Sequence, residues 1–173
     1  NTSMQSITVK HHLDLSIGTS LLFLKRWQKV FNTICRFDNF LNPTECNALI
    51  KEFNNNLKHT KVYRDTITLK IIYKPIFNKL KNIFSFFNFD NPDNMEIVLW
   101  NKDSKMKPHY DTGDILSFIV YLNDNYSGGE TLIDDIKIIP KTGRLILFSN
   151  GFYLHKVNKI KDKKRYTLIG WYK

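Results

Sequence analysis

The chain contains very little cysteine. Its 173 residues include only Cys35 and Cys46, and no Cys-x-x-Cys or mixed Cys/His pattern occurs. Two thiols do not make the disulfide framework of a small secreted protein, and the missing patterns argue against structural zinc. A reducing compartment is therefore the expected environment, and we expect an intracellular, cytoplasmic protein.

Long apolar runs and dividing segments are also missing. The longest apolar run near the start, Leu21–Leu24, is far too short to cross a bilayer, and no cleavage signature follows it. No internal repeat, low-complexity tract or long linker interrupts the chain. We therefore expect a soluble protein without a membrane partner, folded as a single domain over residues 1–173.

Acidic residues are the scarcer charged type. There are 16 Asp and Glu against 26 Lys and Arg, which gives a formal net charge of +10. This excess could attract nucleic acid, acidic proteins or small anions. It is equally compatible with a Lys-rich surface that keeps the protein in solution. No Arg-rich block or RNA-binding motif is present, so a nucleic-acid partner is an alternative that no motif supports.

Hydrophobic and aromatic residues are plentiful, at 42% and 14% of the chain, as in a folded and sheet-rich protein. Residues 1–29 show no clear period. The rest of segment 1–93 predicts N-terminal strands and supporting helices: a strand over Val30–Phe37, a capped helix over 43–57, an extended stretch over 60–73, a second helix opened by Pro75, and a turn at 91–93. The second helix carries an apolar stripe of Ile76, Leu80, Ile83 and Phe87 beside Phe77 and Phe84.

From residue 94 onward, short β-type runs alternate with turn residues. The runs are Glu96–Trp100, Leu116–Leu122, Thr131–Ile133, Ile136–Ile139, Arg144–Phe148 and Tyr166–Tyr172. Evenly spaced short strands with such turns are typical of a barrel or jelly roll. The expected fold is therefore mainly β, with a core over residues 94–173 and helices supporting one outer face.

His109-Tyr110-Asp111 forms an H-x-D triplet. In an extended segment residues i and i+2 point to the same side, so His109 and Asp111 could bind one ion together. His155 lies 46 residues later, between two predicted strands, where a closed sheet could bring it beside the triplet. Two histidines and one carboxylate form the facial triad of non-haem Fe(II) oxygenases. Taken singly, the triplet could also be a surface or turn pair, and His155 a structural residue.

The surrounding residues give these three a family context. The chain reads HYDTGDILSFIVYLNDNYSGGETLI from His109, then IIPKTGRLILFSN, then LHKVNKIKDKKRYTLIGWYK. In this order it resembles the prolyl 4-hydroxylase branch of the 2-oxoglutarate/Fe(II)-dependent dioxygenases, over residues 94–173. The stretch DNFLNPTEC at 38–46 also resembles the usual opening of that family. The resemblance implies a double-stranded β-helix, a form of jelly roll, with iron at its mouth.

The resemblance also implies roles for individual residues. His109, Asp111 and His155 match the metal positions. Arg165 matches the basic residue that pairs with the far carboxylate of 2-oxoglutarate, a role that suits the bidentate fork of a guanidinium. Tyr121 matches a tyrosine that often bonds the same carboxylate. Two further candidates for co-substrate binding are Trp100, where many relatives carry a pocket tyrosine, and Trp171, near the end of the last core strand.

Each of these roles has a structural alternative. Arg165 ends a basic run and could be one more solvated charge, whereas Tyr121 and Trp171 could be core aromatics. The indole of Trp100 is larger than a tyrosine ring and donates from nitrogen, which leaves its role open. The Gly128-Gly129 pair is most simply a bend required by backbone geometry.

The resemblance implies a peptidyl hydroxylase that uses Fe(II), 2-oxoglutarate and O2, with ascorbate as a further candidate cofactor. It would release succinate and CO2, and its substrate would be a protein or peptide, with proline as the leading target. One alternative is the same chemistry on a lysyl residue, a free amino acid or a methylated nucleic-acid base. Another is an inactive β-helix that acts as a binding module, although none of the expected ligand residues is missing.

Overall fold

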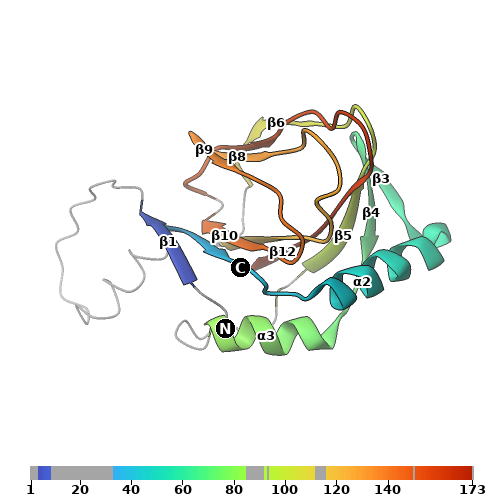
Figure 1. Cartoon of the computed structure of the whole chain (residues 1–173), viewed down its shortest axis with the longest axis horizontal. Coiled ribbons are helices and arrows are strands. Elements are labelled where there is room, and N and C mark those ends of the chain that lie inside the picture. Colours follow the sequence, from blue (N-terminus) through green and yellow to red (C-terminus); the bar gives the residue numbers. More distant parts are fainter. Residues whose placement is uncertain are drawn as a thin grey trace.

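The computed structural model describes residues 4–8, 33–84, 92, 94–111, 116–149 and 151–172. Within these residues the chain forms two antiparallel sheets that face each other (Figure 1). The larger sheet has eight strands in the order β1-β2-β10-β7-β12-β5-β4-β3, and the smaller has four in the order β6-β11-β8-β9. This confirms the predicted mainly β architecture.

The eight-stranded sheet draws strands from the whole chain. Its strands are β1 (Met4–Thr8), β2 (Thr33–Phe37), β3 (Lys61–Tyr63), β4 (Thr66–Lys70), β5 (Asn94–Trp100), β7 (Leu116–Tyr121), β10 (Leu145–Ser149) and β12 (Arg165–Tyr172). Every residue of β7 and β10 is buried. A strand is buried on both faces when layers cover both sides of its sheet, here the helices and the smaller sheet (Figure 1).

The smaller sheet closes the other side of the core. It contains β6 (Met106–His109), β8 (Thr131–Ile133), β9 (Ile136–Ile138) and β11 (His155–Val157). Apolar side chains from both sheets meet between them, among them Ile119, Ile133, Ile146 and Phe148. The strands β6 and β11 were not predicted, and β11 corrects the expectation that His155 lies between strands.

Two helices cover the outer face of the larger sheet (Figure 1). The first, α2 (Pro43–Asn55), begins as predicted: the Asn42 side chain accepts from the Glu45 amide at 2.9 Å, and the Asn42 amide donates to Glu45 Oε2 at 2.8 Å. It ends two residues earlier than predicted, and a short 3-10 helix, η1 (Leu57–His59), follows it. An ion pair from Lys79 Nζ to Glu45 Oε1, at 2.6 Å, joins the second helix to the first.

The second helix, α3 (Lys74–Phe84), starts one residue before Pro75. Ile76 and Leu80 of the predicted stripe are fully buried, while Phe87 lies outside the described residues. The predicted extended stretch 60–73 contains a hairpin, β3 and β4, whose turn places Arg64 at φ +53°. Strand β2 lies within the predicted Val30–Phe37, of which residues 30–32 are outside the described part, as are residues 91 and 93 of the predicted turn. Among the described residues, no helix combines the length and apolar character needed to cross a membrane.

Candidate active site

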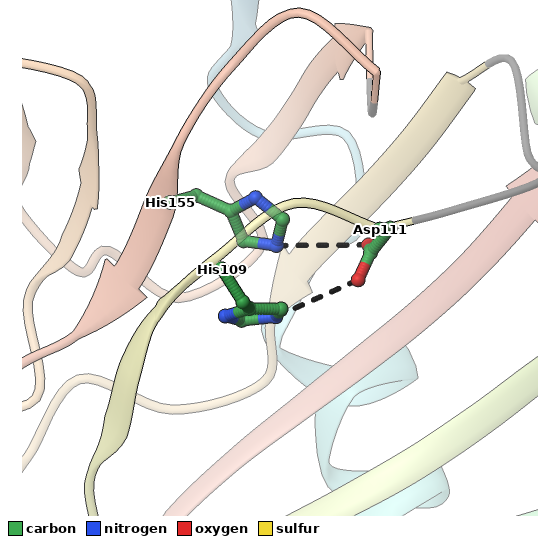
Figure 2. A group of neighbouring side chains, drawn as sticks. All are labelled: His109, Asp111 and His155. Atoms are coloured by element: carbon green, nitrogen blue, oxygen red, sulfur yellow. Dashed lines mark ion pairs between the residues drawn. The ribbon is translucent and has the colours of Figure 1, made fainter.

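The three predicted metal ligands lie together at one end of the smaller sheet. Strand β11 pairs with β6 so that His155 is directly opposite His109, and Asp111 follows β6 by two residues. One ligand atom from each lies within 4.8 Å of the other two. Asp111 Oδ1 is 3.5 Å from His109 Nε2, and Asp111 Oδ2 is 3.6 Å from His155 Nε2 (Figure 2). The fold thus brings together residues that are 46 positions apart in sequence.

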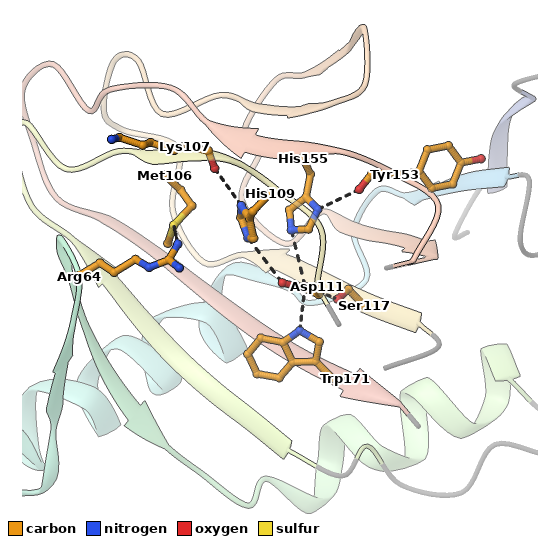
Figure 3. A network of polar contacts seen from close by, with 9 residues as sticks. All are labelled: Arg64, Met106, Lys107, His109, Asp111, Ser117, Tyr153, His155 and Trp171. Carbon is orange, nitrogen blue, oxygen red and sulfur yellow. Dashed lines mark hydrogen bonds and ion pairs between the residues drawn. The ribbon is translucent and has the colours of Figure 1, made fainter. Parts of the chain in front are cut away.

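Contacts behind the three side chains orient them toward a common point (Figure 3). The Nδ1 atoms of His109 and His155 lie 2.9 and 3.2 Å from the carbonyl oxygens of Lys107 and Tyr153. An Nδ1–H bonded to a carbonyl leaves the Nε2 lone pair available to a metal. Burial lowers the pKa of His155, although the Asp111 charge opposes this, and so favours the neutral imidazole that binds metal.

Asp111 is held from the side opposite the histidines. The Trp171 indole N–H donates to Asp111 Oδ2 at 3.1 Å, and the Ser117 hydroxyl donates to the same atom at 3.3 Å (Figure 3). The contacts of Trp171 therefore connect it to the metal ligands rather than to Arg165. Two neutral imidazoles and one carboxylate suit a divalent first-row metal such as Fe(II), with coordination positions left for other ligands.

Arg165 is enclosed in the protein, with 1% of its surface exposed. Its Nη2 donates to Thr131 Oγ1 at 3.2 Å, whereas Nε and Nη1 have no hydrogen-bond partner among the described residues. In the described part of the chain no carboxylate forms an ion pair with it. A buried charge without a counter-ion is strongly unfavourable, so this arrangement fits an anionic ligand with two acceptor oxygens. The far carboxylate of 2-oxoglutarate has that chemistry.

Hydroxyl groups surround the guanidinium. Tyr121 Oη donates to Thr131 Oγ1 at 2.7 Å, and burial raises the pKa of Tyr121, which keeps the group protonated. Thr131 Oγ1 thus accepts from both Tyr121 and Arg165, so its own hydrogen is available to another acceptor. The Tyr126 hydroxyl is buried without a hydrogen-bond partner in the described part of the chain. Burial raises the pKa of Tyr126, and the nearby charge of Arg165 opposes that rise. Sequence reasoning singled out neither Thr131 nor Tyr126.

Gly128 and Gly129 have the bend geometry expected of them, with φ +73° and +64°. Gly129 also permits close packing beside the guanidinium. A Cβ there would be 3.2 Å from Arg165 Cδ and 3.1 Å from Tyr126 Cε2, and it would overlap Ile160. The second glycine of the GGET motif therefore gives the buried arginine its space.

Trp100 lies between the metal side and Arg165. Its indole nitrogen donates to Thr167 Oγ1 at 3.2 Å, and its ring faces the Arg165 guanidinium at 4.7 Å. The Tyr121 ring contacts the same group at 5.4 Å. Trp100 also lines the cavity beside the metal ligands, whereas Arg165 does not. The Trp100 indole thus contacts the buried Arg165 guanidinium and also forms part of the cavity wall.

The cavity beside the three ligands has a volume of about 340 Å³. Tyr63 and Arg64, at the tip of the β3–β4 hairpin, form one side of it, and Met106 on β6 faces them. The Arg64 Nη1 lies 3.2 Å from Met106 Sδ (Figure 3). The remaining lining residues are Thr66, Thr68, Glu96, Val98, Trp100, Ser117, Phe118, Ile119, Phe148, Val157, Ile169, Trp171 and the three ligands. The cavity is large enough for a small ligand or one side chain of a larger substrate.

Comparisons with known proteins agree with this arrangement. Residues 95–173 match the model of the 2OG-Fe(II) oxygenase superfamily. A search of curated protein sequences gives no significant match. Among solved structures, the chain is similar to the 2OG complex of a viral collagen prolyl hydroxylase from Paramecium bursaria Chlorella virus-1, at 21% identity and a TM-score of 0.65, covering 80% of this chain and 93% of that one.

Two further prolyl hydroxylases have similar folds. A Pseudomonas putida prolyl-4-hydroxylase is 16% identical with a TM-score of 0.70, covering 88% of this chain and 97% of that one. A Trichoplax adhaerens prolyl hydroxylase, in complex with a hypoxia inducible factor peptide fragment, is 17% identical with a TM-score of 0.71, covering 87% and 86%. These likenesses confirm the predicted jelly-roll fold. Sequence and fold together place the residues that carry the metal-ligand motif, 95–173, in the 2OG-Fe(II) oxygenase superfamily.

Proposed function

We propose that this protein is an Fe(II)- and 2-oxoglutarate-dependent dioxygenase that hydroxylates a prolyl residue of a peptide or protein. The observation that carries the proposal is the buried Arg165, which has two nitrogens without a hydrogen-bond partner among the described residues and lies over the ring of Trp100, a residue that lines the cavity beside the metal ligands. A carboxylate bound there would remove an otherwise uncompensated charge. The superfamily match to residues 95–173 supports the same cofactors.

Bound Fe(II), with 2-oxoglutarate and O2, would supply the oxidising chemistry that yields succinate, CO2 and a hydroxylated product. The protein's own part is binding and orientation. His109, Asp111 and His155 would hold the metal, and Trp171 would fix the Asp111 carboxylate through its N–H. Arg165, with the hydroxyl of Thr131, would fix the far carboxylate of the co-substrate, and the apolar cavity wall would exclude water.

A peptide substrate is supported by the neighbours and by the cavity mouth. Two of the similar structures are a collagen prolyl hydroxylase and a prolyl hydroxylase bound to a peptide fragment. In the present chain, segments 60–73 and 101–108 both contribute to the cavity, through Tyr63, Arg64 and Met106. Loops and hairpin tips on a rigid sheet commonly carry specificity. We therefore propose that a peptide crosses the mouth between the β3–β4 hairpin and β6.

Mass spectrometry of proline-containing peptides tests the function. With Fe(II), 2-oxoglutarate and O2, we expect a gain of one oxygen atom on proline and one succinate per product. Mn(II) should bind without supporting turnover. Asp111→Ala should lose nearly all activity because the metal loses its charged ligand, whereas Asp135→Asn, at an exposed turn, should not.

Salt dependence separates a peptide from a nucleic-acid substrate. Binding to a phosphate backbone releases counter-ions and weakens steeply as salt increases, whereas a short prolyl peptide should respond mildly. The proposed substrate is wrong if proline peptides leave 2-oxoglutarate turnover at its background rate while methylated oligonucleotides accelerate it and lose their methyl groups. Full activity of Asp111→Ala would instead contradict the proposed metal site.

A further inference from the structure

Among the described residues, the cavity wall contains one carboxylate that the proposed chemistry does not use. Besides the three metal ligands, Arg64 and Glu96 are the described lining residues that carry charge. Arg64 has neighbours for its guanidinium, the Met106 sulfur and the Tyr63 ring, whose centroid is 5.2 Å away. Glu96 is partly buried, and its one hydrogen bond within the described part comes from Asn94 Nδ2 at a long 3.4 Å.

The strand register places Glu96 close to the metal side of the cavity. On β5 and β12, Glu96 is directly opposite Ile169, and Asn94 is directly opposite Trp171. Directly opposed residues point to the same face, so Glu96 and Trp171 are diagonal neighbours, about 7–8 Å apart at most between their Cβ atoms. Trp171 donates to Asp111, and both residues line the same cavity as Glu96, so Glu96 belongs to the part of the wall near the metal ligands.

A second acceptor lies beside this carboxylate. Asn94 Oδ1 is buried and has no hydrogen-bond partner in the described part of the chain, while the nitrogen of the same amide faces Glu96. A buried acceptor without a donor is costly. Asn94 itself does not line the cavity, so Glu96 is the group that a ligand there would contact, and a carboxylate suits a positively charged group with N–H donors.

Among the described residues, Lys70 is the cation that the strand register places beside Glu96. It is directly opposite Glu96 on β4. Its side chain points to the same face as Glu96, but it is exposed, and no ion pair joins it to Glu96 in the described structure. The carboxylate is therefore available to a ligand in the cavity.

We propose that Glu96 binds a cationic group of the substrate, so that the enzyme selects a basic residue next to the proline that it hydroxylates. This inference rests on the proposed function and names its substrate class: prolyl peptides with Lys or Arg close to the target. An extended peptide advances about 3.3–3.6 Å per residue, so a side chain that reaches Glu96 belongs to a residue one or two positions from the target.

Peptide binding without turnover tests this inference. The probes are short peptides with one central proline that differ at a single flanking position, occupied by Lys, Arg, uncharged norleucine or Glu. Affinity is measured by calorimetry on protein loaded with Mn(II) and 2-oxoglutarate. In the wild type we expect the Lys and Arg peptides to bind about 3- to 10-fold more tightly than the norleucine peptide, a moderate factor because solvent screens a partly buried pair.

Glu96→Gln should abolish this preference, because it keeps the side-chain size and removes the charge. Lys70→Gln, which removes the opposing cation, and Asp135→Asn, which removes a remote exposed charge, should both retain it. Equal binding of all peptides, the absence of peptide binding, or a preference that survives in Glu96→Gln overturns the role of Glu96. A peptide bound with the predicted preference but never oxidised under Fe(II) and O2 overturns the proposed function and leaves the Glu96 site. Oxidation of proline peptides without a charge preference supports the proposed function and overturns the Glu96 site.

Discussion

A buried guanidinium without a carboxylate partner, as at Arg165, is expensive to maintain. Burial removes its hydration, and within the described part of the chain its one hydrogen bond runs from Nη2 to Thr131. The rings of Trp100 and Tyr121 contribute cation–π contacts, which offset part of that loss. We propose that a ligand carboxylate completes this site, and the effect of Arg165 on binding is measurable.

Arg165→Ala should weaken 2-oxoglutarate binding by about 10- to 150-fold, because a charge-assisted contact is worth roughly 1.5–3 kcal/mol. Arg165→Lys should recover part of the affinity, since it keeps the charge but loses the fork. Metal affinity should change little in either variant. Calorimetric titration of 2-oxoglutarate into the Mn(II)-loaded protein measures the effect, and wild-type affinity in Arg165→Ala would show that another cation binds the co-substrate.

Residues that occur in a recognisable order could be named as candidates from the sequence. The H-x-D triplet and His155 were named as possible metal ligands, and the resemblance to the dioxygenase family pointed to Arg165. Thr131 and Tyr126 could not be named, because a hydroxyl residue in a strand or bend is common, and only strand pairing decides what it faces. The Thr of GGET was visible in the motif, but the contacts that it accepts from Tyr121 and Arg165 arise from three separate segments.

At the scale of elements, the predicted strands were those with sustained β-type composition. The two that carry histidine ligands were missed. Strand β6 has no alternation of buried and exposed residues, and β11 is only three residues long. Each exists because it pairs with a neighbour, and His155 meets His109 through that pairing. Local propensity is a weak guide to such short strands, since tertiary pairing stabilises them.

The loop before β10 joins the larger sheet to the segment that precedes α2, and Gly143 makes the hydrogen bonds between them. Gly143, at φ +77°, donates its amide to Tyr121 O at 2.8 Å and accepts from the Leu41 amide at 3.2 Å, just before α2. A Cβ at this position would overlap the Leu41 carbonyl oxygen. Gly143→Ala should therefore destabilise the fold by at least about 2 kcal/mol, from left-handed strain and the clash.

For a chain of this size, that loss lowers Tm by roughly 4–8 °C. The matched control is Gly151→Ala, where a Cβ would meet no heavy atom within 4 Å, so its Tm should stay close to the wild type. Differential scanning calorimetry of the two variants compares them directly. Equal Tm values would show that the loop adjusts freely and does not fix α2 to the sheet.

At the scale of the whole molecule, strands from the two predicted segments, residues 1–93 and 94–173, form one sheet. Strand β2 pairs with β10, and β4 pairs with β5, so residues before and after position 93 share the same layer. This supports the single domain that we propose for the chain. The sequence indicated the layers but not their order, because the pairing of distant strands leaves no local pattern in the residues themselves.

Stability of the whole molecule should reflect the unpaired charge at Arg165. Replacing a buried charge that lacks a partner by an apolar side chain of similar length removes a desolvation penalty. Arg165→Met should therefore raise the Tm of the ligand-free protein by a few degrees. The same variant should lose the stabilisation that 2-oxoglutarate gives to the Mn(II)-loaded wild type. That stabilisation amounts to about 2.7 kcal/mol at one hundred times Kd, or roughly 5–11 °C.

Thermal melts of both proteins, with Mn(II) alone and with Mn(II) plus 2-oxoglutarate, measure the two effects together. Succinate, which keeps one carboxylate for Arg165 but lacks the 2-oxo acid end, should stabilise the wild type less than 2-oxoglutarate and Arg165→Met not at all. An Arg165→Met protein with a lower ligand-free Tm and an unchanged 2-oxoglutarate shift would contradict the argument. It would mean that the guanidinium stabilises the core through its contacts with Trp100, Tyr121 and Thr131, and is not an uncompensated charge that a bound carboxylate neutralises.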